Sequence, residues 1–207
     1  MRILFQGDSV TDGGRDRRNY FDLGSGYAKY AAEHIRNACP DQELEFINLG
    51  IGGNRTDQLF DRIYLDGIKL NPDVISILIG INDIGHRYGV ERIATSDAQF
   101  EMNYRGILER LKNETSAKIV IMAPYLLDAK RPEGMREDLK KILPIVRKLA
   151  EEYADVYIPL DQYFDEALKT QPEPLYYSGD AVHPNENGKQ FIGKIYADAV
   201  IPVIKQF

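Results

Sequence analysis

The sequence predicts an α/β fold, specifically a three-layer α/β/α sandwich in which helices cover both faces of a five-stranded parallel sheet. Two observations carry this prediction. Five short apolar segments rich in β-branched residues alternate, along the 207 residues, with segments in which apolar residues recur at helical spacing. Two of the apolar segments, 74–79 and 118–122, are almost continuously apolar, as is typical of parallel strands that are buried on both faces.

The predicted strands are residues 3–5, 44–48, 74–79, 118–122 and 156–158. Four stripes of apolar residues, spaced three or four positions apart, predict helices that pack on the sheet. In chain order the stripes are Tyr27, Tyr30, Ala31, Ile35 and Ala38; Phe100, Tyr104, Ile107, Leu108 and Leu111; Leu139, Ile142, Leu143, Val146, Leu149 and Tyr153; and Phe191, Ile192, Ile195 and Tyr196. Pro144 interrupts the third stripe and predicts a kink or a split in that helix. The charged segment 128–138 is predicted to be a surface loop.

Length and composition predict one domain over residues 1–207, because 43% hydrophobic and 28% charged residues are ordinary for a globular domain. A net charge of −6 argues against a nucleic-acid partner, which rewards clustered basic surface. The densest basic cluster, Arg15, Arg17 and Arg18, is short and is predicted to be a solvated loop. Cys39 is the only cysteine, which excludes a disulfide within the chain.

No segment approaches the roughly 18 apolar residues of a transmembrane helix, which predicts no membrane partner. The first residues, 1–5, lack the apolar stretch and the cleavage site of a secretory signal. The expected location is therefore cytoplasmic. The sequence leaves the oligomeric state open, and a homo-oligomer is compatible with it.

Small and polar residues follow four of the predicted strands, at 7–9, 50–54, 80–83 and 123–125. Open α/β sheets bind their ligands beyond the carboxyl ends of the strands. We therefore expect these residues to converge on one rim of the sheet, and that rim is the candidate functional site.

Ser9 follows Gly7 and Asp8, two residues suited to a tight turn that would expose the serine hydroxyl on this rim. A serine in such a place is most often a turn or capping residue. A second motif elsewhere in the chain is needed before Ser9 is interpreted as a nucleophile. Asp180 stands three residues before His183, close enough in a short loop for its carboxylate to accept from Nδ1 of the ring. Nε2 is then available to take a proton from a serine. The sequence thus predicts Ser9 as nucleophile, His183 as base and Asp180 as the orienting carboxylate.

Acyl transfer also needs hydrogen-bond donors directed at the developing oxyanion. Ser9 has its own backbone N–H for this purpose. Gly53 lies in a Gly-Gly-Asn turn and can bring a second N–H close because it has no Cβ. Asn82 offers a side-chain amide after the third strand, although by itself it would be taken for a turn residue. Ser9, Gly53 and Asn82 are the predicted oxyanion hole.

The chain resembles the SGNH hydrolases, also called GDSL-type esterases and lipases. The matching blocks are residues 7–11, Gly53, residues 80–83 and residues 180–183, in the order in which the family has them. The resemblance implies a flavodoxin-like sheet, the Ser-His-Asp triad and oxyanion hole named above, and no metal or organic cofactor. It also implies that Asp8 steadies the turn of the nucleophile.

Within that superfamily the chain is similar to the intracellular acetyl-xylan and acetyl-xylooligosaccharide esterases, in segments 11–15, 23–27 and 79–83. This similarity implies a small-molecule ester as partner and substrate, an acetylated mono- or oligosaccharide. Lysophospholipids, acyl thioesters and aryl esters remain alternatives within the superfamily. Tyr88 and Tyr177 are candidates to stack on a sugar ring, and packing residues are the alternative interpretation of both.

Two other classes of function stay open from the residues alone. A Mg²⁺-dependent phosphoryl-transfer domain on the same fold would use Asp8 and Asp83 as ligands. Such a site normally has a second carboxylate after the first strand and a lysine after a later one, where this chain has Ser9-Val10 and Ala123-Pro124. A non-catalytic module would bind the same ester without turnover.

Overall fold

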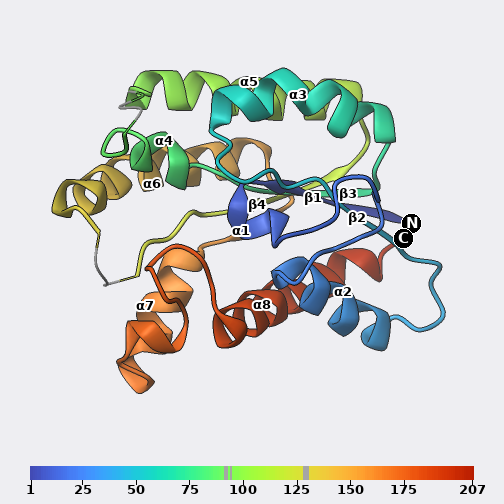
Figure 1. Cartoon of the computed structure of the whole chain (residues 1–207). Helices are drawn as coiled ribbons and strands as arrows, with labels where there is room; N and C mark the ends of the chain where they lie inside the picture. Colours follow the sequence, from blue (N-terminus) through green and yellow to red (C-terminus); the bar gives the residue numbers. More distant parts are fainter. Residues whose placement is uncertain (91–92, 94, 128–130) are drawn as a thin grey trace.

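The computed structural model describes residues 1–90, 93, 95–127 and 131–207 and has, within them, a five-stranded parallel sheet of order β2-β1-β3-β4-β5 (Figure 1). The strands are β1 (Arg2–Gly7), β2 (Glu45–Asn48), β3 (Val74–Leu78), β4 (Lys118–Met122) and β5 (Val156–Ile158). Each pair of neighbours is parallel. This is the flavodoxin-like order of an open, doubly wound sheet. The predicted fold class is therefore confirmed.

Helices cover both faces of the sheet (Figure 1). They are α1 (Ser9–Asp12), α2 (Tyr27–Ala38), α3 (Thr56–Asp66), α4 (Ile81–Gly85), α5 (Asp97–Glu114), α6 (Glu133–Tyr153), α7 (Leu160–Thr170) and α8 (Glu186–Ile204), with short 3₁₀ turns η1 (Ile68–Leu70) and η2 (Pro174–Tyr176). Helices α2 and α8 pack together on one face, and α5 packs between α3 and α6 on the other. The four predicted stripes lie in α2, α5, α6 and α8, whereas α3 and α7 were not predicted.

The core lies on both sides of the sheet because the central strands are buried on both faces. Every residue of β3 is buried, which explains its continuous apolar sequence. On the α2–α8 side, the rings of Phe5 and Tyr196 lie 5.1 Å apart, and Tyr27 meets Phe5 edge-on. On the other side, Phe100 and Tyr104 of α5 are fully buried.

The loop predicted at 128–138 is wrong from Glu133 onward, and of the kink or split predicted at Pro144 the split is contradicted. The segment predicted as a loop at 128–138 is helical from Glu133 onward, while residues 128–130 lie outside the described part of the chain. Met135 and Leu139 are buried four positions apart, so the segment is the amphipathic start of a helix, in which Glu133 and Glu137 are exposed and Asp138 is buried. Pro144 does not split α6, because the packing of Ile142 and Val146 outweighs the backbone hydrogen bond that a proline forfeits.

The basic cluster is also not a solvated loop throughout, since Arg15 is buried. Its Nε donates to the carbonyl of Gly50 at 3.1 Å. Arg17 and Arg18 are exposed and pair with Asp12 and Asp16. Arg15 therefore ties the segment after α1 to the turn after β2, which a count of charges does not reveal.

The chain leaves β1 for β2 in one direction and then crosses back over β1 to reach β3. The connections after β1 and β3 consequently diverge, which opens a crevice beyond their carboxyl ends. Ser9 begins the helix after β1, and Asn82 lies in the helix after β3. The topology thus brings the first and third motifs to the same crevice.

Close approach of β1 to its neighbours makes Gly7 a stability determinant. A Cβ at Gly7 would overlap the backbone oxygen of Leu78 and the side chain of Thr11. We expect Gly7→Ala to lower the free energy of unfolding by about 3 kcal/mol or more, because the backbone of β3 cannot move aside. Chemical denaturation monitored by circular dichroism measures the change. Gly179→Ala is the matched control, since a Cβ there meets nothing within 4 Å, and equal losses in both variants would contradict the argument.

Candidate active site

Ser9, His183 and Asp180 form a continuous hydrogen-bonded relay. Oγ of Ser9 lies 2.9 Å from Nε2 of His183, and Nδ1 of His183 lies 2.7 Å from Oδ2 of Asp180. The serine and the histidine are 174 positions apart in the chain. The structure therefore brings together the three residues that the sequence predicted as a triad.

The local sequence explains why Ser9 stands on the rim. Asp8 is buried, and its Oδ1 accepts from the backbone N–H of Val10 at 3.0 Å, which caps the short helix α1. Ser9 is the first residue of that helix, so its hydroxyl leaves the sheet toward the crevice. Its backbone N–H is one of the helix's first four, which have no acceptor within the helix.

The loop that holds His183 is organised by Asp180. Oδ1 of this carboxylate accepts from the backbone N–H groups of Val182 and His183 at 3.1 and 2.7 Å. Burial opposes ionisation of Asp180, but the hydrogen bonds from the His183 ring and from these two N–H groups outweigh it and hold its pKa at about 2. Asp180 is thus an anion at neutral pH. Nδ1–H of His183 donates to it, and Nε2 faces Ser9 as an acceptor.

Two of the predicted oxyanion donors, Gly53 and Asn82, meet at the turn after β2. A Cβ placed on Gly52 would come within 3.7 Å of Cβ of Ser9, so the turn that contains Gly53 lies beside the nucleophile. Gly53 has a φ of +83°, which favours glycine. Nδ2 of Asn82 donates to the carbonyl of Asn54 at 3.0 Å, which fixes the orientation of the amide. Asn82 is thus tied to the turn that contains Gly53, and the role of these groups as oxyanion donors stays a prediction.

Asp12 is a site residue that sequence reasoning missed. Its Oδ2 accepts from the backbone N–H of Gly52 at 3.0 Å and from Nη2 of Arg17 at 2.6 Å. This carboxylate therefore ties the helix of the nucleophile to the glycine turn. The only available signal was its place three residues after Ser9, which does not identify a partner 40 residues away.

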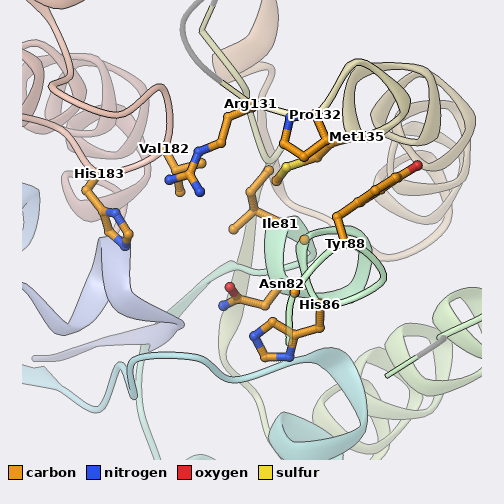
Figure 2. Close-up of a pocket in the computed structure, with 11 residues that line it drawn as sticks. Ile81, Asn82, His86, Tyr88, Arg131, Pro132, Met135, Val182 and His183 are labelled. Carbon is orange, nitrogen blue, oxygen red and sulfur yellow. The ribbon is translucent and has the colours of Figure 1, made fainter. Parts of the chain in front are cut away.

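A cavity of about 270 Å³ opens between the His183 loop, α4 and the start of α6 (Figure 2). Its lining residues are Ile81, Asn82, Gly85, His86, Tyr88, Gly89, Arg131, Pro132, Met135, Val182 and His183. The lining is apolar at Ile81, Pro132, Met135 and Val182, and it is polar at Asn82, His86, Tyr88, Arg131 and His183. Tyr88 is one of the lining residues, and its hydroxyl donates to Oδ2 of Asp138 at 2.9 Å; stacking on a sugar ring stays a prediction.

Tyr177 does not line this cavity. Only 7% of it is exposed, and its ring meets those of Phe164 and Phe191 at centroid distances of 5.6 and 5.3 Å. It contributes to a separate hollow between α2, α7 and α8, so the structure favours the packing interpretation. Tyr177 is therefore not part of the cavity beside the triad.

Arg131, which lines the cavity, is a second site residue that sequence reasoning missed. Its Nη2 lies 2.7 Å from Oδ2 of Asp180, and its Nε donates to the carbonyl of Asp180 at 2.8 Å. The guanidinium lies beside Val182 in Figure 2. No spacing in the sequence could reveal this contact, since 49 residues separate the partners.

Asp8 and Asp83, the carboxylates of the magnesium alternative, are both committed to the protein's own backbone. Asp83 accepts from the N–H of Thr56 at 3.1 Å and from its hydroxyl at 2.7 Å. Burial raises the pKa of Asp8 to about 7 and that of Asp83 to about 6. Ligands of Mg²⁺ are normally fully ionised carboxylates, so these two suit such a site poorly.

Two further findings concern the described ranges 1–90, 93, 95–127 and 131–207. In them no group of three or more His, Cys, Asp or Glu side chains is placed to hold a metal ion. In the same ranges no helix has both the length and the apolar character that crossing a membrane requires.

Comparison with known proteins adds independent findings. Residues 5–191 match the GDSL-like Lipase/Acylhydrolase family. The chain is 30% identical to an acetylxylan esterase of Geobacillus stearothermophilus over 202 residues, which cover 94% of this chain and 91% of that protein.

Solved structures give the same result. A GDSL-like lipase of Parabacteroides merdae superposes with a TM-score of 0.90 at 32% identity, covering 95% of this chain and 94% of that one. Axe2, an acetylxylan esterase of Geobacillus stearothermophilus, superposes with a TM-score of 0.86 at 29% identity, covering 95% and 92%. Variants of Axe2 at one serine, one histidine and one aspartate have been solved as catalytic mutants.

Proposed function

Because the chain belongs to the GDSL-like lipase/acylhydrolase family, we propose that it is a serine esterase which removes short acyl groups, above all acetyl, from carbohydrate hydroxyls. Family membership and the similarity to an acetylxylan esterase make it a carboxylic ester hydrolase. The proposal adds the mechanism, the residues and the substrate.

The observation that carries the proposal is the relay from Ser9 through His183 to Asp180. In the first step Oγ of Ser9 attacks the ester carbonyl while Nε2 of His183 takes its proton. The carbonyl electrons move to the oxygen, where the N–H groups of Ser9 and Gly53 and the amide of Asn82 stabilise the negative charge. Return of these electrons expels the alcohol, which receives the proton from His183. An acyl-enzyme remains on Ser9.

Water completes the cycle by the same proton path. His183 takes a proton from water as its oxygen attacks the acyl-enzyme, and then returns a proton to Oγ of Ser9 as the carboxylic acid leaves. Asp180 keeps the ring in the tautomer that both steps need and stabilises the imidazolium that each step forms. No group outside the chain is required for these transfers.

The lining of the cavity supports a sugar as the alcohol half of the ester. At about 270 Å³ it is far larger than an acetyl group and accommodates a sugar ring. A sugar has an apolar face and a polar edge, which suit a lining that has apolar side chains such as Ile81 and Met135 and polar ones such as Asn82 and His86. Axe2, an acetyl-xylooligosaccharide esterase, is similar to this chain over most of its length, which favours the same substrate class.

The test is a panel of nitrophenyl esters of increasing acyl length, run beside acetylated xylose and xylo-oligosaccharides. We expect kcat/KM to fall steeply beyond acyl chains of about four carbons, by roughly tenfold for each methylene that does not fit, and the acetylated sugars to be deacetylated readily. Release of acetic acid measures the latter. Prolonged chelation with EDTA is the control and should leave the rates unchanged.

Other outcomes would redirect the assignment. Faster cleavage of esters with eight or more acyl carbons, or of lysophospholipid or acyl thioester with acetylated sugars untouched, would contradict the substrate. Activity lost to EDTA and restored by Mg²⁺ would contradict the serine mechanism itself.

A further inference from the structure

The loop that carries His183 is held by its carbonyl groups. Four successive carbonyls each accept a hydrogen bond from a side chain or an N–H elsewhere in the chain. The bonds run from Nε of Arg131 to Asp180 at 2.8 Å, from the N–H of Leu127 to Ala181 at 2.9 Å, from the hydroxyl of Tyr125 to Val182 at 2.8 Å and from the hydroxyl of Ser178 to His183 at 2.7 Å. Three of the four donors lie between β4 and α6. The segment after β4 therefore sets the course of the loop.

The loop needs this support because its backbone is strained. Ala181 has a φ of +75°, in the left-handed region that residues with a Cβ rarely adopt. Such a conformation persists only where the surroundings hold it in place. The restraint comes from the hydrogen bonds that the carbonyls of Asp180, Ala181 and Val182 accept.

Arg131 differs from the other donors because it also contacts the triad. Its Nη2 binds Oδ2 of Asp180, the same oxygen that accepts from Nδ1 of His183. Side chains of Arg131 and Asp180 are 31% and 43% exposed, so solvent screens this pair only in part. One guanidinium thus anchors both the backbone and the carboxylate of Asp180.

We infer that Arg131 is a positioning residue of the triad, which holds the His183 loop through the carbonyl of Asp180 and lowers the basicity of His183 by sharing the carboxylate. The inference rests on the proposed function. It goes beyond that function because Arg131, which follows β4, would change the basicity of His183 through Asp180 without touching the reacting atoms.

The sign of the effect follows from the charges around the ring. Asp180 favours the imidazolium, and the neighbouring guanidinium opposes it. Asp8 lies under the Ser9 turn, and its carboxylate also favours the imidazolium. Burial raises the pKa of Asp8 to about 7, and the nearby charge of Asp83 raises it further. Across the cavity, Arg55 pairs with Asp57 and lies 3.3 Å from Nδ1 of His86. Among the described residues, Arg131 supplies the cation that binds the carboxylate used by His183, so its removal should raise the pH at which His183 loses its proton.

The experiment measures how fast a small dialkyl fluorophosphate modifies Ser9 as a function of pH. Oγ of Ser9 forms a bond to phosphorus, fluoride leaves, and His183 takes the serine proton, so the acid limb of the rate reports the protonation of His183 without any sugar. For Arg131→Gln we expect the midpoint of this limb to rise by about half a pH unit or more. The plateau rate should fall roughly tenfold, because the loop loses one anchor.

Arg131→Lys separates charge from shape. A lysine keeps the positive charge but cannot bind the carbonyl and the carboxylate together, so the midpoint should stay near that of the wild type while the plateau falls. Arg110→Gln is the matched control, because Arg110 forms an exposed ion pair with Glu114 on α5, far from the site, and should change neither quantity. Thermal unfolding of each variant checks that the fold is intact.

The outcomes are distinct. A midpoint that does not move in Arg131→Gln, or one that moves equally in Arg131→Lys, overturns the inference while modification of Ser9 still supports the esterase. An unchanged midpoint with a KM raised only for anionic esters assigns Arg131 to substrate binding instead. Absence of any mass on Ser9 in the wild type overturns the proposed function itself.

Discussion

Replacement of Ser9 by alanine is expected to lower kcat by at least about 10⁴-fold, because the acyl-enzyme no longer forms. His183→Ala should cost a similar factor, since an unassisted serine hydroxyl is a poor nucleophile. The double variant should be no worse than either single one, because the members of a relay act as a unit. Hydrolysis of nitrophenyl acetate, corrected for spontaneous hydrolysis, measures all three.

Ser116→Ala supplies the control for a serine hydroxyl, since Ser116 is exposed in the loop before β4. Its kcat should stay within about twofold of the wild type, as expected of an exposed position away from the site. A Ser9→Ala enzyme that retains more than about a tenth of the wild-type kcat would remove Ser9 as the nucleophile.

Asp180→Asn is expected to keep the fold yet lower kcat by roughly 10²- to 10⁴-fold. The amide oxygen can still accept from the N–H groups of Val182 and His183, which leaves NH₂ directed at Nδ1 of the ring. Nδ1 must then be the acceptor, so Nε2 carries the proton and can no longer take one from Ser9. The same NH₂ would face the guanidinium of Arg131, which weakens the pair.

Kinetics and unfolding must be measured together to test this change. Asp198→Asn is the matched control, because Asp198 pairs with Lys194 on the surface of α8. It should change kcat by less than about twofold. A loss of activity in Asp180→Asn accompanied by an equal loss of folded protein would assign Asp180 a structural role, and near-normal kcat in a folded variant would remove it from the triad.

Elements with a strong local signal were predictable from the residues. Continuous apolarity identified β3 and β4, because a parallel strand covered on both faces has no solvent-exposed side. The stripe of α5, all of it buried, identified that helix. Helices α3 and α7 were missed because each buries few side chains, only Leu59 and Ile63 among the apolar residues of α3, and so has a short stripe.

The candidate site was predictable to the extent that it follows from order along the chain. Strand ends meet at one rim of a parallel sheet, so Ser9, Gly53 and Asn82 had to converge once the strands were recognised. Asp180 and His183 are three positions apart, a spacing that lets the carboxylate reach the ring when a short loop holds both. A relay between them and Ser9 remained a hypothesis until the 2.9 Å contact was seen.

What the sequence by itself determined is the type of fold and the rim, together with the candidate reactive groups on it, because these depend on periodicity and on residue type. Only the tertiary structure decided which neighbours act on those groups. Arg131 and Asp12 reach the site from segments that no local pattern links to it, and Tyr177 leaves it for a buried aromatic cluster. The reason is physical: side-chain contacts between distant segments depend on how helices pack on the sheet, and packing is a property of the folded chain as a whole.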